Sequence, residues 1–238
     1  AKKCDYIDNE FEKKIPNFVH FYHIIIFHYL RRILKYDYAL ARTEKKVGQT
    51  RQDYLCNTEN VTIEEDLKRR DLTINAIAKN VLTGEIIDPF KGALHIKMKK
   101  AHPVSKAFDE DPLRVIRAAR FIARYELTPS MDLTLRCYQL SNEGISAERV
   151  GDELRKLFKQ AAKPSIFFNF LREVCWLGYY FKELENLIDV PQSPNHHPEG
   201  DAYTHTMHCI DAATDPFTRA VMLCHDLGKY EKTTVDGI

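Results

Sequence analysis

The sequence predicts a mixed α/β unit at the N-terminal end of the chain and an all-helical remainder. The chain has 238 residues, of which 44% are hydrophobic and 29% are charged, a composition typical of a globular protein with a packed core. Strand-like and helix-like segments alternate before residue 100, whereas the periodic segments from residue 111 onward all have helical spacing. These observations favour two architectures within one chain.

The α/β unit is predicted from its apolar patterns. A run of apolar and aromatic residues over 18–27 fits a buried strand, although 21–36 can also be read as a helix. Thr62 and Glu65 have the spacing of a capping box, and apolar residues then recur at helical intervals. We therefore expect a helix over 63–80.

The remainder is predicted to contain helices over 111–125, 132–141, 148–160, 164–176, 201–213 and 218–229. The sequence Val-Pro-Gln-Ser-Pro-Asn at 190–195 cannot continue a helix, so it is the best linker candidate. We expect domains over 1–100, 101–190 and 191–238. Because the chain begins at Ala1 without methionine and stops soon after a helix-like segment, we expect the first and last domains to be incomplete.

Composition excludes several classes of protein. The nine glycines form no Gly-rich phosphate loop, so a P-loop or Rossmann enzyme is not expected. The six cysteines form no CxxC pair, which favours reduced thiols in the cytoplasm. The longest apolar stretch, 18–30, is interrupted by histidines and is shorter than the ~20 residues of a membrane span, and no signal peptide precedes it. We expect a cytoplasmic protein without a membrane partner.

Basic residues concentrate between residues 91 and 124, where nine Lys and Arg residues accompany three acidic ones, although the whole chain has a net charge of +1. On a helix, four of the arginines fall on one stripe with apolar residues opposite: Arg114, Arg117, Arg120 and Arg124. The stripe is either a solvated helix face or a surface for phosphate groups.

Asp111 and Arg114 stand at the start of the same predicted helix. The structural interpretation is that Asp111 is an N-cap followed by Pro112 at the first helical position. The functional interpretation uses the pairing edge that cytosine and adenine share, an exocyclic amino donor beside a ring-nitrogen acceptor. A carboxylate that accepts from the amino group and a guanidinium that donates to the ring nitrogen would admit C and A and reject U and G.

Five sequence blocks, taken in order, resemble one family: 37–46, 67–77, 88–92, 108–121 and 148–153. They are similar to the bacterial class II tRNA nucleotidyltransferases, the CCA-adding enzymes. The resemblance implies an α/β nucleotidyltransferase head followed by an all-helical neck and body. It also implies addition of C, C and A to tRNA 3′ ends from CTP and ATP, with two Mg²⁺ ions.

The resemblance assigns roles to residues within these blocks. It implies that Arg70 helps to hold the triphosphate, that Asp111 and Arg114 read the base, and that Arg117 supports the nucleotide. It implies structural support from Asp71, Glu148 and Glu153. For the two glutamates, the alternative is an exposed carboxylate pair five positions apart.

The metal site of the head is the point where the sequence departs from the family pattern. Asp37 stands where the family usually has a glutamate, and aspartate is still a Mg²⁺ ligand. The nearest match to the expected D-x-D is formed by Asp5 and Asp8, which have two residues between them. Because residues three apart on a strand point to opposite faces, either a bulge restores the site or the chain lacks it.

A second resemblance lies near the C-terminal end. His205, His225 and Asp226 look like the start of an HD domain, a helical fold that binds a divalent metal, and the fourth ligand would lie beyond Ile238. The alternative is that these histidines are ordinary hydrogen-bonded polar residues. The fold class expected from both resemblances is therefore an α/β head, an all-helical neck and body, and a helical HD-type segment.

Three other functions stay open at this point. A bacterial poly(A) polymerase shares the head and arginine blocks but adds only A. A catalytically inactive tRNA-binding remnant would keep the positive helix. The HD-type segment could also dominate as a metal-dependent phosphohydrolase.

Overall fold

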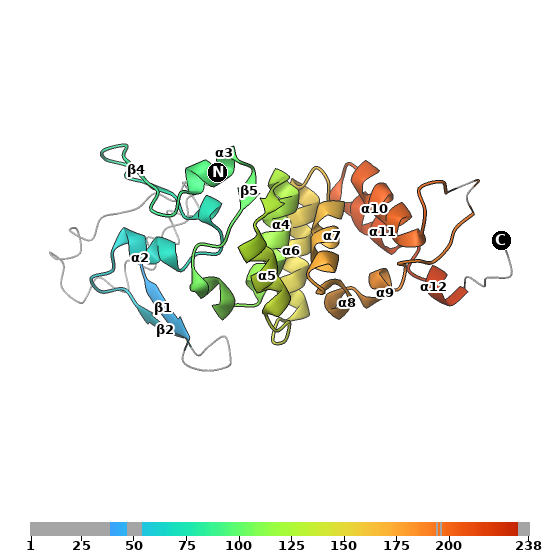
Figure 1. The fold of residues 1–238 in the computed structure, drawn as a ribbon, viewed down its shortest axis with the longest axis horizontal. Coiled ribbons are helices and arrows are strands. Elements are labelled where there is room, and N and C mark those ends of the chain that lie inside the picture. The colour runs from blue at the N-terminus through green and yellow to red at the C-terminus, as the bar shows by residue number, and fades with distance from the viewer. Residues whose placement is uncertain (1–38, 47–53, 194, 196, 233–238) are drawn as a thin grey trace. The chain divides into compact units, whose positions relative to one another are not determined.

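The computed structural model describes residues 39–46, 54–193, 195 and 197–232 (Figure 1). The chain divides into two compact units, residues 1–96 with 104–108 and residues 97–103 with 109–238. The strand or helix expected within 18–36 lies outside the described residues. Across the described segments, every helix falls short of the length and apolar character that a membrane crossing requires.

The first unit contains short strands and short helices. Strand β1 (Thr43–Lys46) pairs antiparallel with β2 (Tyr54–Asn57), and β3 (Ala78–Lys79) pairs antiparallel with β4 (Ile86–Ile87). The helical elements are α2 (Ile63–Lys68), the 3-10 turn η2 (Thr73–Asn75) and α3 (Gly92–Lys97). Leu67, Ala76 and Ala78 form a buried apolar cluster against which Ile63, Ile87, Phe90 and Val104 pack.

Helix α2 begins at the predicted capping box but is much shorter than predicted. Thr62 Oγ1 accepts a hydrogen bond from the Glu65 N–H at 3.3 Å, and Glu65 Oε2 accepts one from the Thr62 N–H at 2.8 Å. The expected helix over 63–80 is wrong, because α2 ends at Lys68. Asp71 Oδ1 accepts hydrogen bonds from the Leu72 N–H and Asn75 Nδ2, and such side-chain bonds stabilise a turn in competition with a helix.

Helix α3 is fixed by the Asp-Pro-Phe-Lys-Gly block that precedes it. The Asp88 carboxylate accepts hydrogen bonds from the backbone N–H groups of Gly92 at 2.6 Å and Ala93 at 2.9 Å. A Cβ atom on Gly92 would overlap the Thr73 carbonyl oxygen and the Ile77 side chain. Residue 92 must therefore be glycine for α3 to approach η2 so closely.

The second unit is mostly helical, as predicted. The 3-10 turn η3 (Lys106–Glu110) precedes its first helix. Its helices are α4 (Leu113–Tyr125), α5 (Met131–Gln139), α6 (Ala147–Gln160), α7 (Ser165–Glu173), α8 (Leu177–Tyr180), α9 (Lys182–Glu185), α10 (Ala202–Ala212), α11 (Pro216–Cys224) and α12 (Lys229–Lys232). The exception is a parallel pair of two-residue strands, β5 (Lys100–Ala101) and β6 (Thr128–Pro129), which the sequence pattern did not predict.

Helices α4, α6 and α7 form the centre of this unit (Figure 1). The segment after residue 190 packs against these helices: Arg219 donates hydrogen bonds to the carbonyl oxygens of Phe158 and Ala161, each at 2.7 Å. Asp211 on α10 accepts hydrogen bonds from the N–H and the hydroxyl of Ser165. The structure therefore joins α10 and α11 to the preceding helices, and the domain boundary near residue 190 stays a prediction.

Candidate nucleotide-binding site

Arg70 is held in place by a buried carboxylate within the first unit. Arg70 Nη2 lies 3.1 Å from Asp66 Oδ2, and Arg70 Nη1 donates to the Asn75 carbonyl oxygen at 3.0 Å. Arg69 binds the other oxygen, with Nη2 at 2.7 Å from Asp66 Oδ1. A guanidinium has five N–H donors, so these two contacts orient Arg70 and leave further N–H groups that can donate to a ligand.

Asp66 is a residue that the sequence reasoning missed. Burial disfavours its charged form, but hydrogen bonds from Arg69 and Arg70 and the charge of Arg69 outweigh this, so the pKa of Asp66 lies below the ordinary 3.8. The sequence signal for this contact is the spacing of Asp66, which stands three positions before Arg69 and four before Arg70, as in ion pairs along a helix.

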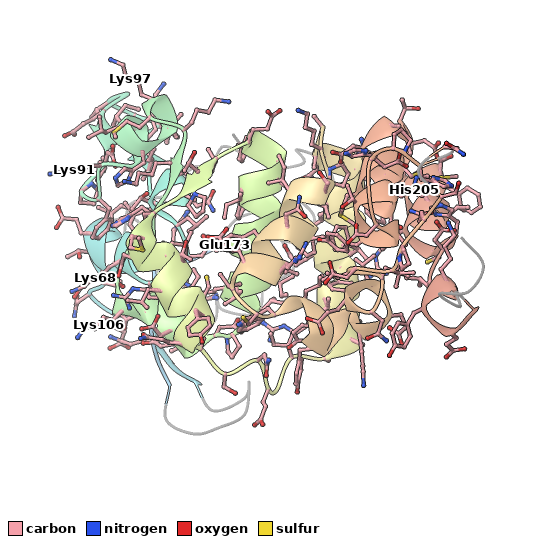
Figure 2. The ribbon with its side chains drawn as sticks, turned by 45° about the vertical axis from the view of Figure 1, so that its right-hand side comes forward. Lys68, Lys91, Lys97, Lys106, Glu173 and His205 are labelled. Atoms are coloured by element: carbon pink, nitrogen blue, oxygen red, sulfur yellow. The ribbon has the colours of Figure 1, made fainter. Side chains whose placement is uncertain are left out.

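Asp71 is buried, and its supporting role stays a prediction. Its carboxylate shapes the η2 turn through Leu72 and Asn75, and Arg70 contacts the Asn75 carbonyl of the same turn. The first unit also carries exposed basic side chains: Lys68, Lys91 and Lys106 point outward in Figure 2.

Asp111 precedes α4 in the second unit and both of its carboxylate oxygens are engaged. Oδ1 accepts a hydrogen bond from the Leu113 N–H at 3.1 Å, and Oδ2 lies 2.8 Å from Arg149 Nη2 on α6. The helix begins at Leu113 with Pro112 as its N-cap, so the predicted cap position is displaced by one residue, although Asp111 still binds the first helical N–H.

Arg114 lies in the first turn of α4, half-buried. Its N–H donates to the Asp111 carbonyl oxygen at 2.9 Å, which places the two residues in one turn of the chain. Arg149 was not predicted as a site residue, although it lies in the 148–153 block next to Glu148.

The arginine stripe of α4 faces helix α6 along part of its length. Arg120 is only 4% exposed and its Nε lies 2.5 Å from Glu153 Oε2 on α6, while Arg124 Nη1 donates to Gln160 Oε1 at 2.8 Å. The expectation of a solvated or phosphate-facing side chain is therefore wrong for Arg120, because α6 packs along that face, whereas Arg124 is only half-buried. Arg117 Nη1 lies 4.0 Å from Glu153 Oε1 and its side chain is 34% exposed.

Glu153 is the centre of this buried charge cluster. Lys156 Nζ lies 2.6 Å from Glu153 Oε1, on the opposite oxygen from Arg120. Burial raises the cost of its charge, but the hydrogen bonds from Lys156 and Arg120 and the charges of Arg120 and Arg117 prevail, so the pKa of Glu153 lies below 4.5. Glu148 is exposed, and among the described residues no ion pair involves it, so the two glutamates have different surroundings.

His205, His225 and Asp226 converge near α10, where Figure 2 labels His205. Asp226 Oδ2 lies 3.2 Å from His225 Nε2 and 3.9 Å from His205 Nε2. Lys229 Nζ approaches the same oxygen to 2.7 Å without the alignment of a hydrogen bond, so within the described part of the chain this buried oxygen has no hydrogen-bond donor. Two imidazoles and an incompletely satisfied carboxylate oxygen fit a divalent cation.

The three carboxylates predicted for the metal site of the head, Asp5, Asp8 and Asp37, lie outside the described residues.

Comparison with known proteins gives the class of this fold. Residues 2–102 match the poly A polymerase head domain family. Together with the mostly helical second unit, this match defines a nucleotidyltransferase-type head followed by helices. Nucleotidyltransferases of this superfamily generally use divalent metal ions.

Curated relatives and solved structures identify the family. The multifunctional CCA protein of Actinobacillus pleuropneumoniae serotype 5b (strain L20) is 41% identical over 213 residues, 82% of this chain and 51% of the relative. The multifunctional CCA protein of Methylococcus capsulatus is 40% identical over 205 residues, 81% of this chain and 48% of the relative. The chain thus spans about half the length of these relatives.

Two solved structures are similar to this one. The Bacillus stearothermophilus CCA-adding enzyme in complex with CTP has a TM-score of 0.53 at 30% identity and covers 64% of this chain and 38% of its own. The CCA-adding enzyme apo form II has a TM-score of 0.55 at 22% identity, covering 83% and 47%, and supports the fold alone. The chain belongs to the family of bacterial class II CCA-adding enzymes.

Proposed function

We propose that this chain acts as a tRNA nucleotidyltransferase that adds C and A to tRNA 3′ ends from CTP and ATP without a nucleic-acid template. The observation that carries the proposal is the Asp111 carboxylate, held at the start of α4 by the Leu113 N–H and by Arg149, with Arg114 in the same turn. Family membership supports the same function.

The chemistry of these two side chains supports base selection. A carboxylate oxygen offers two lone pairs, so Asp111 can keep both partners and still accept from the exocyclic amino group of C or A. Arg114 donates to the ring nitrogen of the same edge. Uracil and guanine would place a carbonyl against the carboxylate and a ring N–H against the guanidinium, which leaves polar groups without partners.

Arg70 and Arg117 have supporting parts in this proposal. We assign Arg70 to the triphosphate, since a guanidinium oriented by Asp66 and the Asn75 carbonyl is a fixed multidentate phosphate donor. Arg117 contributes positive charge beside the nucleotide. Asp71 and Glu153 support these groups structurally, and Glu148 keeps this assignment from the family resemblance alone.

The transfer step also needs metal ions. We assign Mg²⁺ to Asp5, Asp8 and Asp37; when bound, two such ions lower the pKa of the tRNA 3′-hydroxyl and neutralise the departing pyrophosphate. The head at 1–100, the neck and body at 101–190, the HD-type segment from 191 and a cytoplasmic location complete the proposal.

The test is incorporation of labelled CTP and ATP onto a tRNA that ends at the nucleotide before its CCA sequence. The proposal predicts that both nucleotides are added and that UTP and GTP are not. Addition of A alone would identify a poly(A) polymerase. Binding of the tRNA with no addition of any nucleotide would identify an inactive remnant.

The convergence of His205, His225 and Asp226 favours a second function, a divalent metal site of the HD type. Both imidazoles present Nε2 toward the buried Asp226 oxygen, so the three side chains face a common point. Binding of a divalent ion by the full chain, lost in His225→Ala, is the expected result. Unchanged binding in that variant would contradict the assignment.

A further inference from the structure

A thiol lies beside the histidines of the proposed HD-type site. His205 and Cys209 are four positions apart on α10, and Cys209 Sγ lies 3.4 Å from His205 Nε2. The ligand atoms of His205, Cys209 and His225 all lie within 4.8 Å of one another. The sequence resemblance gave no role to Cys209, so this thiol is a feature of the structure that the proposed function does not use.

The two imidazoles contact oxygen acceptors through Nδ1, and their Nε2 atoms face Cys209 and Asp226. His205 Nδ1 lies 2.5 Å from Glu199 Oε1, and His225 Nδ1 lies 2.7 Å from the Met222 carbonyl oxygen. Because a carboxylate and a carbonyl are acceptors, Nδ1 of each ring can donate to them, and Nε2 is then the atom that would ligate an ion. This arrangement, in which an acceptor fixes the tautomer of the ring, is the one that orients histidine ligands in metal sites.

The spacing between sulfur and nitrogen suits a bound ion. With zinc–sulfur and zinc–nitrogen distances of ~2.3 and ~2.0–2.1 Å, tetrahedral ligands would stand about 3.6 Å apart. The observed 3.4 Å between Cys209 Sγ and His205 Nε2 is close to this value. Without an ion, Cys209 Sγ and His205 Nε2 are within hydrogen-bond distance. To bind an ion as a thiolate, Cys209 would release its proton to solvent.

The geometry points to Cys209 as a thiolate ligand that joins His205 and His225, so that this site selects a zinc-class ion over Mg²⁺. The inference rests on the proposed HD-type metal site and adds its ligand set and metal class. Imidazole and thiolate favour borderline and soft ions, whereas Mg²⁺ and Ca²⁺ prefer oxygen ligands. Lys229 Nζ lies 2.7 Å from Asp226 Oδ2, and a Cys209 thiolate would add a second negative charge beside the two imidazoles.

Cobalt titration of the full chain tests this inference, because Co²⁺ takes the place of zinc and its absorption reports the ligands. After removal of bound metal by a chelator, we expect the d–d bands of a tetrahedral ion together with a sulfur-to-cobalt charge-transfer band. Both should persist in excess Mg²⁺. Cys209→Ser should lose the charge-transfer band. It should also weaken Zn²⁺ binding by at least ~10-fold, because loss of a residue that only hydrogen-bonds to a metal ligand already has an effect of that size.

Cys224→Ser is the matched control, since Cys224 is an exposed thiol next to His225. The sulfur-to-cobalt charge-transfer band should survive in Cys224→Ser. If Cys224→Ser loses this band and Cys209→Ser keeps it, the inference is overturned. Cobalt bands that lack sulfur character and disappear in His205→Ala would also overturn it while leaving the HD-type site intact. If the chain binds no cobalt, both the Cys209 ligand and the proposed HD-type metal site are overturned, whatever the result of the nucleotide incorporation assay.

Discussion

Arg149 Nη2 lies 2.8 Å from Asp111 Oδ2, and this ion pair joins α6 to the residue that precedes α4. The side chains are 20% and 30% exposed, so the pair is partly shielded from water. Its geometric effect is to fix the rotation of the carboxylate whose other oxygen binds the Leu113 N–H. Arg149 is therefore a positioning residue for Asp111 in the proposed base selection.

Arg149→Ala should reduce base discrimination. With one partner gone, the Asp111 carboxylate can rotate away from the amino group of the base, and a hydrogen bond of about 1 kcal/mol corresponds to a several-fold to ~10-fold change. The CTP-to-UTP incorporation ratio should fall by that factor. Arg155→Ala is the control, because Arg155 is on the same helix and pairs with Asp152 in an exposed position. An equal fall in both variants would contradict a specific role for Arg149.

Asp66→Asn should weaken binding of all four nucleoside triphosphates to a similar degree. The change removes the charge that orients Arg70, and Arg70 contacts phosphate rather than base in this account. The measurement is equilibrium binding of CTP and UTP, with Glu64→Gln as a control at an exposed position of α2. Loss of affinity for CTP alone would be inconsistent with a triphosphate role.

Glu153→Gln should destabilise the protein by about 3 kcal/mol at neutral pH, because Arg120 is left buried without its counter-charge. The pKa of Glu153 is lowered on folding, so its stabilisation is present above the unfolded value near 4.5 and is lost as the pH falls through the folded value. The difference in the free energy of unfolding between wild type and Glu153→Gln, measured by chemical denaturation, should therefore become smaller at acid pH. Glu148→Gln should change stability by less than about 0.5 kcal/mol. A difference in unfolding free energy that does not change with pH would contradict the stabilising role of the ionised Glu153.

Gly92→Ala should destabilise the protein by about 1–3 kcal/mol, since the added methyl group overlaps the Thr73 carbonyl and backbone must move. Thermal unfolding is the measurement. Gly84→Ala is a poor comparison because Gly84 has a φ of +76°, whereas Gly151→Ala on α6 meets only an arginine nitrogen 4.0 Å away and should be tolerated. Equal stability of Gly92→Ala and wild type would show that α3 and η2 are not closely packed.

The sequence was sufficient where the signal is local. Apolar periodicity predicted the helical second unit, and Thr62 with Glu65 predicted the start of α2. The end of α2 could not be predicted from periodicity, because Asp71 and Asn75 form a turn whose hydrogen bonds compete with the helix. The two-residue strands β5 and β6 depend on pairing across a long sequence separation and leave no periodic pattern.

In the candidate site, too, local sequence patterns predicted single residues but not their contacts with residues on other elements. Asp111, Arg114 and Arg70 were predicted from residue type and block, but the contacts of Asp111 with Arg149 and of Arg70 with Asp66 were not. The burial of Arg120 was missed because a helix pattern shows which residues share a face and not which helix covers that face. Here α6 covers it and places Glu153 against Arg120.

The most direct test of the account compares nucleotide selection in Asp111→Ala and Arg70→Ala on a tRNA that ends before its CCA sequence. Because a hydrogen bond to a charged group contributes about 1.5–3 kcal/mol, Asp111→Ala should lower the CTP-to-UTP incorporation ratio by at least ~10-fold. Arg70→Ala should lower incorporation of every nucleotide and leave that ratio unchanged. If the ratio is the same in wild type and Asp111→Ala, the base is not chosen by the carboxylate of residue 111.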